Sequence, residues 1–502
     1  MNSTNEHINP FEVSTGSAKL GQLKVLAPVL LGLLIITLMI AKSGLLPAIG
    51  CLGLLFVSIL LYKLFTIPRL GIILLVIQGF LVIGLSRYVP APLGLSIDGV
   101  LLILYLALFF KAFAEKIKWS KAKSHLTLLV AMWFGYIMLQ IANPEAQSVA
   151  AWFYAMRGLG LYQFLVIPLA FVLFNKPKDL QLFFIVWGVM SLLGTMKGLM
   201  QFTMGVDPYE QAWLNAGSYK THILFGKLRV FSFYSDAGQF GAAQGHAGIV
   251  FLMLAVFRKA ASMKLRAFYL TVGVLGLFGM LISGTRGAIS VPGMAGIMYL
   301  ILSKNVKMLT LGAIFGLSVY VFFAHTTLMH SNPEIRRMRT AFDPNDASLQ
   351  VRLANQRKLK SYLASRPIGG GVGATGNWGQ RFTPHTFLAN TATDSWYVMI
   401  WADTGVVGLW YYLFMMFFIL ITGAYNVMFR IKNQDQKIMV TAITCGFAGI
   451  MMASYGNGVL GQMPTGIVMY LSMVFMFSSR RWKDDSAIEN EKELTEPIKS
   501  IQ

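Results

Sequence analysis

The chain has few charged residues, few acidic residues in particular, and almost no cysteine. Charged residues occupy 13% of its 502 positions, about half the roughly 25% typical of soluble domains, which excludes an ordinary soluble globular protein. Its two cysteines, Cys51 and Cys445, fall in apolar stretches, so a disulfide framework is excluded. Only 21 acidic residues stand against 42 lysines and arginines. No recognisable nucleic-acid module accompanies this basic charge, so no nucleic-acid partner is expected.

Long apolar runs are what the chain has in abundance, with 56% hydrophobic residues and a mean hydropathy of +0.61. A helix needs about 17–25 apolar residues to cross a membrane. We therefore predict an all-α polytopic integral membrane protein with about fourteen transmembrane helices. The predicted spans are 25–41, 44–62, 70–86, 95–113, 126–142, 158–174, 180–196, 239–257, 267–283, 287–302, 308–324, 396–422, 438–455 and 463–477.

The distribution of lysine and arginine predicts the orientation of these spans. Every second short loop is basic, for example at 111–123, 258–266 and 430–437. Because basic loops remain cytoplasmic, both termini are expected in the cytoplasm. The first span follows a long polar leader without a clear cleavage site, so we expect it to be uncleaved.

The span pattern also predicts how the chain is divided. The expected segments are a cytoplasmic N-terminal segment (1–24), spans 1–11 (25–324) with a shorter outer loop at about 197–238, a large basic outer loop between spans 11 and 12 (325–395), spans 12–14 (396–479) and a disordered cytoplasmic tail (480–502). The large outer loop is strongly basic, although long loops escape the charge rule. A basic surface at a membrane face favours a substrate that carries phosphates.

Four arginines lie near the predicted outer ends of spans and are the candidate phosphate-binding residues. Arginine can bind a pyrophosphate through two hydrogen bonds at once, which lysine does less well. Arg286, in the short sequence SGTRGA, would be costly at the bilayer edge unless hydrated or paired. A snorkelling arginine at the interface is the alternative interpretation. The other three are Arg157, Arg229 and Arg352.

Asp394 is the first candidate for a general base, because it precedes a span at the outer side, near the arginines. If the helix begins at Asp394, Gly405 and Gly408 lie on nearly the same face. Asp394 or Thr393 could instead cap the helix. His385 is the alternative base.

Weaker candidates surround these residues. His222 and Asp236 are possible bases in the shorter outer loop, and Asp98 and Asp403 are expected to balance nearby arginines. No His, Cys, Asp or Glu cluster has metal-ligand spacing, so a transferase without metal or cofactor is expected.

Three short motifs in the C-terminal half resemble the superfamily of O-antigen ligases and Wzy-type polysaccharide polymerases. They are SGTRGA at a span start, SLQVRLANQRKLKSYLASRPIGGGVGATG in the large outer loop, and DSWYVMIWADTGVVG at the next span. Their order and spacing match the family pattern over roughly 225–425. The ligases carry histidine where this chain has Asp394, which favours a polymerase.

The resemblance implies transfer of a glycan from an undecaprenyl-pyrophosphate donor to a lipid-linked acceptor, at the outer face of a bacterial inner membrane. It implies that Arg286, Arg157 and Arg229 neutralise the departing pyrophosphate, that Arg352 docks the donor, and that Asp394 or His385 deprotonates the acceptor. The product would be O-antigen, capsule or exopolysaccharide. Membrane lipids, a flippase and a chain-length regulator are the implied partners.

Other functions stay open at this point. A ligase would transfer the finished glycan from the same donor to lipid A-core or protein. A lipid or polysaccharide flippase would have symmetric halves and charges near the bilayer midplane, and the sequence has no useful internal repeat. A non-enzymatic assembly partner is the remaining alternative.

Overall fold

The computed structural model describes residues 31–32, 38, 41, 46–89, 91–224, 226–328, 331, 339, 343 and 345–482. These residues fall into two compact units, Met1–Ile67 and Pro68–Gln502. Most of the predicted first span, much of the large basic loop between 329 and 344, and the tail from 483 onward lie outside the described residues. In the first unit, the long described helix is α2, Leu46–Thr66.

The described chain is helical apart from one short hairpin, which confirms the predicted all-α class at that level. Eight helical segments are long and apolar enough to cross a membrane, and they correspond to eight of the predicted spans. They are α4 (Leu95–Ala114), α5 with η2 (His125–Ala142), α6 with η3 and α7 (Val149–Leu173), α8 (Pro177–Met204), α11 (Ala237–Phe257), α12 (Met263–Ile282), α18 with η7 (Trp396–Arg430) and α19 (Gln434–Ala453). The total of about fourteen spans stays a prediction.

The remaining elements are shorter or less apolar. The apolar ones are α3 (Arg69–Leu85), η5 (Arg286–Ile289) continuing into α13 (Ser290–Leu302), α14 (Val306–His325) and α20 (Thr465–Ser478). The others are η1 (Trp119–Ala122), α9 (Pro208–Trp213), η4 (Leu214–Ser218), α10 (Tyr219–His222), β1 (Ile223–Leu224), β2 (Lys227–Leu228), α16 (Ala347–Leu363), α17 (Gly376–Phe382) and η8 (Ser479–Arg481). Strands β1 and β2 pair antiparallel.

Small polar residues define where several of the long helices begin. The side chain of Ser148 accepts a hydrogen bond from the Ala151 amide at the start of α6. Asp236 accepts one from Gln239 at the start of α11. Such caps satisfy amide groups that have no partner within the helix, so a helix start can be placed from sequence wherever a Ser or Asp precedes an apolar run.

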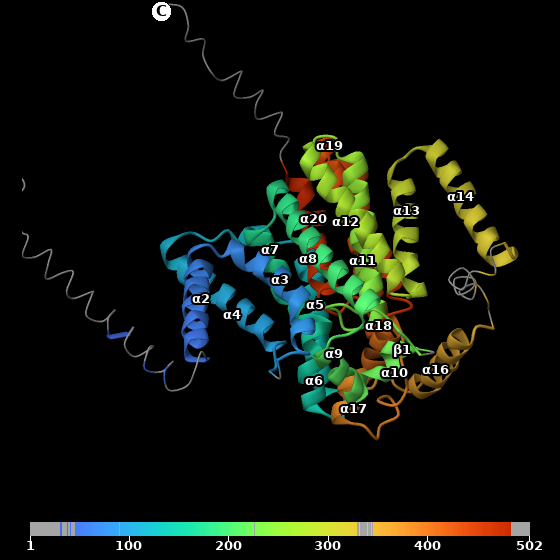
Figure 1. The fold of residues 1–502 in the computed structure, drawn as a ribbon, viewed down its shortest axis with the longest axis horizontal. Helices are drawn as coiled ribbons and strands as arrows, with labels where there is room; N and C mark the ends of the chain where they lie inside the picture. The colour runs from blue at the N-terminus through green and yellow to red at the C-terminus, as the bar shows by residue number, and fades with distance from the viewer. Residues whose placement is uncertain are drawn as a thin grey trace, which may run out of the picture. The chain divides into compact units, whose positions relative to one another are not determined.

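Helices α11, α12, α13 and α19 form the most closely packed part of Pro68–Gln502 (Figure 1). Their approach depends on glycine: a methyl group on Gly276 would lie 2.9 Å from the amide nitrogen of Gly248, and one on Gly446 would lie 2.5 Å from the His246 ring. Small residues at helix contacts are the usual solution in membranes, where van der Waals packing replaces the hydrophobic effect. This closely packed core supports the segments described next.

A polar cluster fixes the segment between α8 and α11. Helix α8 runs eight residues beyond the predicted span end at 196, so Lys197 lies inside the helix. The Lys197 ammonium contacts the carboxylates of Asp207 at 2.9 Å and Glu210 at 3.2 Å. Tyr88 donates a hydrogen bond to Asp207. Burial acts to raise the pKa of Asp207, but hydrogen bonds from Tyr88, the Glu210 amide and Lys197 outweigh it and lower that pKa to about 2.

In Figure 1 the short elements α9, α10, α17 and β1 lie at the same end of this unit as α16. Arg87 joins this end to α3, because its guanidinium donates to the carbonyl oxygens of Ser232, at 2.6 Å, and of Tyr234. The same guanidinium stacks over the rings of Trp213 and Phe231. The segments that carry the candidate residues are therefore anchored on the helical body.

Candidate functional site

The loop between α19 and α20, residues 454–464, is where most of the candidate residues meet. We call it the α19–α20 loop. It follows the buried end of α19, and its contacts run to α11, η5, α16, α18 and the turn within Val149–Leu173. Sequence analysis treated it only as the short connection between the last two spans. Five segments far apart in the sequence converge on it.

Arg229 and Arg286 lie beside one another through Thr285. Arg229 Nη2 donates to Thr285 Oγ1 at 2.9 Å, and Thr285 Oγ1 donates to the carbonyl oxygen of Ala237 at 3.0 Å. The next residue, Arg286, forms a bidentate ion pair with Asp346, the N-cap of α16. The distances are 3.0 Å from Nη1 to Oδ2 and 3.3 Å from Nη2 to Oδ1. The side chains of this pair keep 27% and 16% of their surface exposed. The two guanidinium groups are thus held in place, and Arg286 still reaches solvent.

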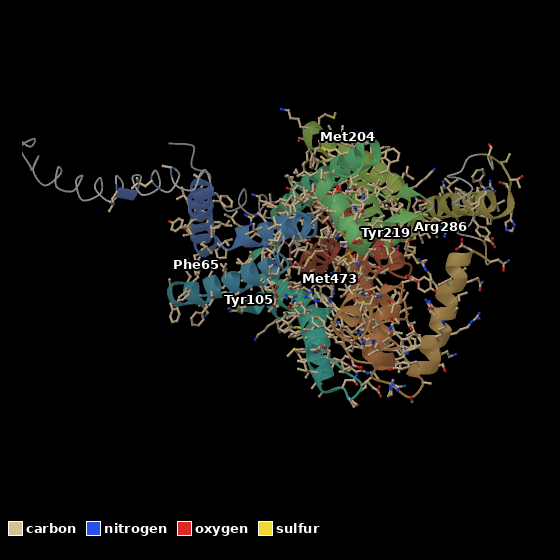
Figure 2. All side chains as sticks on the ribbon, turned by 60° about the horizontal axis from the view of Figure 1, so that its bottom comes forward. Phe65, Tyr105, Met204, Tyr219, Arg286 and Met473 are labelled. Atoms are coloured by element: carbon tan, nitrogen blue, oxygen red, sulfur yellow. The ribbon has the colours of Figure 1, made fainter. Side chains whose placement is uncertain are left out.

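Figure 2 labels Arg286 at the margin of the packed helices, on the side where α16 lies. Helix α16 was predicted as the amphipathic helix of the basic loop, and it buries Leu359 and Leu363 against Val398 and Ala402. Arg352 is on α16, and a methyl group on Gly456 would lie 3.7 Å from its Nη1. Arg352 therefore borders the α19–α20 loop, and within the described part of the chain no carboxylate forms an ion pair with it.

Asp394 is exposed, directly before α18. It has a positive φ of 50°, which is uncommon for a residue other than glycine. Ser395 follows and caps α18: its hydroxyl accepts from the Val398 amide and donates to the carbonyl oxygen of Ser454 at 3.3 Å. The Trp396 amide donates to the same oxygen at 3.0 Å. Asp394 is thereby placed next to the α19–α20 loop.

Two sequence interpretations of this segment are wrong. The cap is Ser395, since a residue at φ 50° has left the extended conformation of a cap. The helical stripe from Asp394 to Gly405 does not exist either. Helix α18 begins at Trp396 and is broken at Gly405, where φ is 71° and ψ is −173°.

Asn457 connects η5 with the start of α11. A methyl group on Gly287 would lie 2.8 Å from its Nδ2, and one on Gly238 would lie 2.9 Å from its Oδ1. Among the described residues, Nδ2 of Asn457 is buried without a hydrogen-bond partner. A buried amide without a partner is costly, so it is a natural contact point for a ligand. Asn457 was not among the candidate residues predicted from the sequence, although the polar run SYGNG between two apolar spans indicated a polar loop there.

Arg157 lies in the helical segment Val149–Leu173. It was expected just before the sixth span, but the helix already begins at Val149, and Arg157 starts the π-helical turn η3 (Arg157–Leu161) within it. Its Nη1 contacts Asp98 at 3.3 Å, as the expected balancing role of Asp98 requires. A methyl group on Gly158 would lie 3.3 Å from the carbonyl oxygen of Gly461. The backbone next to Arg157 thus approaches the α19–α20 loop at Gly461.

A glycine run between α16 and α17, in the loop predicted to lie on the outer side, packs against the break in α18. A methyl group on Gly405 would lie 2.0 Å from the carbonyl oxygen of Pro367. The amides of Gly370 and Gly371 donate to the carbonyl oxygens of Ala402 and Asp403 at 2.9 and 3.0 Å. These bonds satisfy carbonyl groups that the break in the helix leaves without partners.

Asp403 has a different role from the one expected. Its buried carboxylate accepts hydrogen bonds from the amides of Gly373 and Thr375 and from the Thr375 hydroxyl, at 2.8–3.2 Å. It binds the segment that contains Gly373 and Thr375, and it balances no arginine among the described residues. The motifs PIGGGVGATG and ADTGVVG are therefore bonded directly to one another.

The remaining candidate bases differ in their surroundings. The carbonyl oxygen of His222 accepts a hydrogen bond from the Arg229 amide at 2.8 Å, so His222 lies beside one of the arginines. His385 is exposed on the turn after α17, and among the described residues no hydrogen bond joins it to the α19–α20 loop. His222 is buried, and its ring contacts the carbonyl oxygens of Ser218 and Ser235, so it supports the fold. Asp236 caps α11 and accepts from the Ser235 hydroxyl.

The site therefore combines several arginine guanidinium groups, an exposed carboxylate and an unsatisfied amide at one end of the long helices. Such an arrangement can hold a doubly charged phosphate group, and Asp394 can accept a proton. In the described ranges, no group of three His, Cys, Asp or Glu side chains is positioned to hold a metal ion. No protein-family model matches the sequence, and no curated protein matches it significantly.

Proposed function

We propose that this chain is a membrane glycosyltransferase that polymerises lipid-linked repeat units of a bacterial polysaccharide. The donor is an undecaprenyl-pyrophosphate-linked glycan and the acceptor a second lipid-linked glycan, at the outer face of the inner membrane. One observation carries the proposal: the three short motifs that resemble the polymerase and ligase superfamily are held together. Arg286 of the first is paired with Asp346, which caps helix α16 two residues before the second motif. The glycine run of the second packs against Gly405 of the third.

The arginines support a pyrophosphate leaving group. Arg229, Arg286 and Arg352 come from three separate segments. Arg229 donates to Thr285, the neighbour of Arg286, and Arg352 borders the α19–α20 loop. Preorganised cations that stabilise charge as it develops are usually the largest single contribution to catalysis. Arg157, in the helical segment Val149–Leu173, extends this positive surface. Asp346 and Asp98 hold two of the arginines in position.

The proposed reaction is a single displacement at the anomeric carbon of the donor sugar. An acceptor hydroxyl forms the new carbon–oxygen bond as the bond to the pyrophosphate breaks. Asp394 takes the hydroxyl proton, and the lipid pyrophosphate leaves with the bonding electrons beside the arginines. The exposed position of Asp394 next to Ser395 and the loop leaves room for an acceptor. His385 is the alternative base.

The test is glycan length in the native strain, with the chromosomal gene replaced by wild type, Arg286→Ala or Asp394→Asn at matched membrane levels. Arg357→Ala is the control, since Arg357 is an exposed arginine of α16. A polymerase predicts that both site variants lose long chains, while a single repeat unit still reaches its final acceptor. The control keeps normal length.

Two other outcomes assign the chain differently. Long chains that accumulate on the lipid carrier would indicate the ligase alternative. Repeat units that remain on the inner leaflet would indicate a flippase. Normal glycan in both site variants would reject the site and leave the arginines as interface anchors.

A further inference from the structure

A second basic pocket lies at the helix ends formed by the end of α7, the start of α8 and the end of α20. It encloses about 1030 Å³, part of it open to solvent. Pro177 begins α8 and Ser478 ends α20, and both line the pocket. Because α7 and α8 belong to membrane-crossing segments, a pocket at their ends lies at a membrane surface.

The pocket carries four positive charges and no acidic side chain in its lining. The cations are Lys121, Lys176, Lys178 and Arg481. Among the described residues none of them forms an ion pair with a carboxylate. Arg481 is fixed by donating to the carbonyl oxygens of Lys121 and Lys123, at 3.0 and 3.2 Å. These carbonyl oxygens orient the guanidinium without neutralising its charge.

Ser478 gives an independent indication of a ligand. It is 4% exposed, lines the pocket, and its hydroxyl has no hydrogen-bond partner among the described residues. Buried hydroxyl groups are normally satisfied. A phosphate oxygen in the pocket would accept the missing hydrogen bond.

The apolar part of the lining favours a lipid over a free anion. Phe171 and Trp482 border the cations, and the Trp482 indole donates to the carbonyl oxygen of Asn175 at 2.7 Å. Tryptophan beside lysine and arginine is typical of the membrane interface. Basic pockets between membrane helices on the cytoplasmic side bind anionic lipid headgroups.

We propose that this pocket binds the phosphate headgroup of an anionic phospholipid. Lys121, Lys178 and Arg481 bind the phosphate, Ser478 donates to it, and the partly exposed Trp482 contacts the upper part of an acyl chain. The proposal is independent of the polymerase site, which lies among other residues.

The test measures phospholipid retained by the full chain after extraction from vesicles of phosphatidylglycerol and phosphatidylethanolamine, by native mass spectrometry. The variant combines Lys121→Gln, Lys178→Gln and Arg481→Gln. Its control combines Lys259→Gln, Lys264→Gln and Arg266→Gln. Lys259 lies between α11 and α12, and Lys264 and Arg266 lie in the first turn of α12. We expect the pocket variant to retain on the order of 100-fold less phosphatidylglycerol, and the control to match wild type.

Further arms separate the possible occupants. Wild type should keep its lipid in excess inorganic phosphate, and displacement by phosphate alone would overturn the lipid assignment. Equal retention by the pocket and control variants would also overturn it. The sequence after Trp482 contains Asp484, Asp485 and Glu489. If truncation after Trp482 is needed before any lipid binds, the occupant is the acidic tail.

Discussion

At the scale of single residues, the candidate site depends on side chains whose neighbours fix them in place. Arg286 is oriented by Asp346, and Arg229 by Thr285. Asp394 differs from them, because it is exposed and has a backbone conformation that only a few residue types tolerate. Asparagine shares that tolerance, so the charge of Asp394 can be removed without changing its backbone.

Asp394→Asn should therefore lower the activity without lowering the amount of folded protein in the membrane. We expect a loss of polymer-forming rate of about 10²–10⁴-fold, the usual contribution of general base catalysis, with an unchanged membrane level and thermal unfolding midpoint. The measurement is chain elongation by membranes supplied with lipid-linked repeat units. His385→Ala is the comparison, and a larger loss in that variant would transfer the base to His385.

The polar cluster around Asp207 predicts an acid-sensitive contribution to stability. The pKa of Asp207 is about 2 in the folded chain, below the value of about 3.9 expected when unfolded. A lowered pKa stabilises the fold above the unfolded value, and this contribution is lost as pH falls from about 4 to about 2. We expect the unfolding midpoint of the detergent-solubilised protein to fall across this window.

Lys197→Gln removes one cause of the low pKa of Asp207. Its unfolding midpoint should be lower than that of wild type at pH 6 and should fall less between pH 4 and 2. Parallel pH curves for the two proteins would contradict the assigned role of the cluster. Lys264→Gln serves as the control for loss of a single lysine.

At the scale of elements, the existence of α18 could be predicted from the sequence, but the break within it could not. Its apolar run predicted a span, and the structure has a helix there. The break at Gly405 could not be foreseen from periodicity, because it depends on Pro367 and Gly369 packing against it from the outer loop. The same applies to Asp403, whose partners are amides of that loop.

Gly405→Ala should destabilise the protein strongly. The new methyl group would lie 2.0 Å from the Pro367 carbonyl oxygen at a φ of 71°, and such backbone strain costs about 1–3 kcal/mol before the clash is counted. Gly293→Ala is the matched control, since a methyl group there meets nothing within 4 Å. In detergent, the thermal unfolding midpoint of Gly405→Ala should be lower than that of Gly293→Ala. Equal midpoints would show that the contact between Gly405 and Pro367 does not stabilise the protein.

At the scale of the whole molecule, sequence reasoning predicted the helical membrane class and the helices that are long and apolar enough to span. It also selected Arg229 and Arg286, which lie together at Thr285, and Arg352, which borders the α19–α20 loop. It could not identify the loop itself, because convergence of distant segments depends on packing. Asn457 was missed for this reason. Arg157 was predicted to precede its helix. The prediction was wrong because the helix begins earlier, at the Ser148 cap.

The predicted topology can be tested by cysteine labelling, since the chain has only two natural cysteines to replace. Ala392→Cys is in the large outer loop, and Lys264→Cys is in a predicted cytoplasmic loop. A membrane-impermeant maleimide added to intact cells or spheroplasts should label the first, and should label the second only after lysis. Labelling of both or neither from outside would reject the orientation, and with it the outer location of the site.

The clasp between the glycine run and Gly405 also bears on biogenesis. Residues 367–375 are synthesised before 403–405, so amide partners for the Asp403 carboxylate already exist when α18 leaves the ribosome. Until they bind, α18 carries an unpartnered carboxyl group and a bend without support. Substitutions in the glycine run should therefore delay the pairing of Asp403 and leave the chain open to membrane proteases during insertion. The amount of protein in the cell should fall as a result.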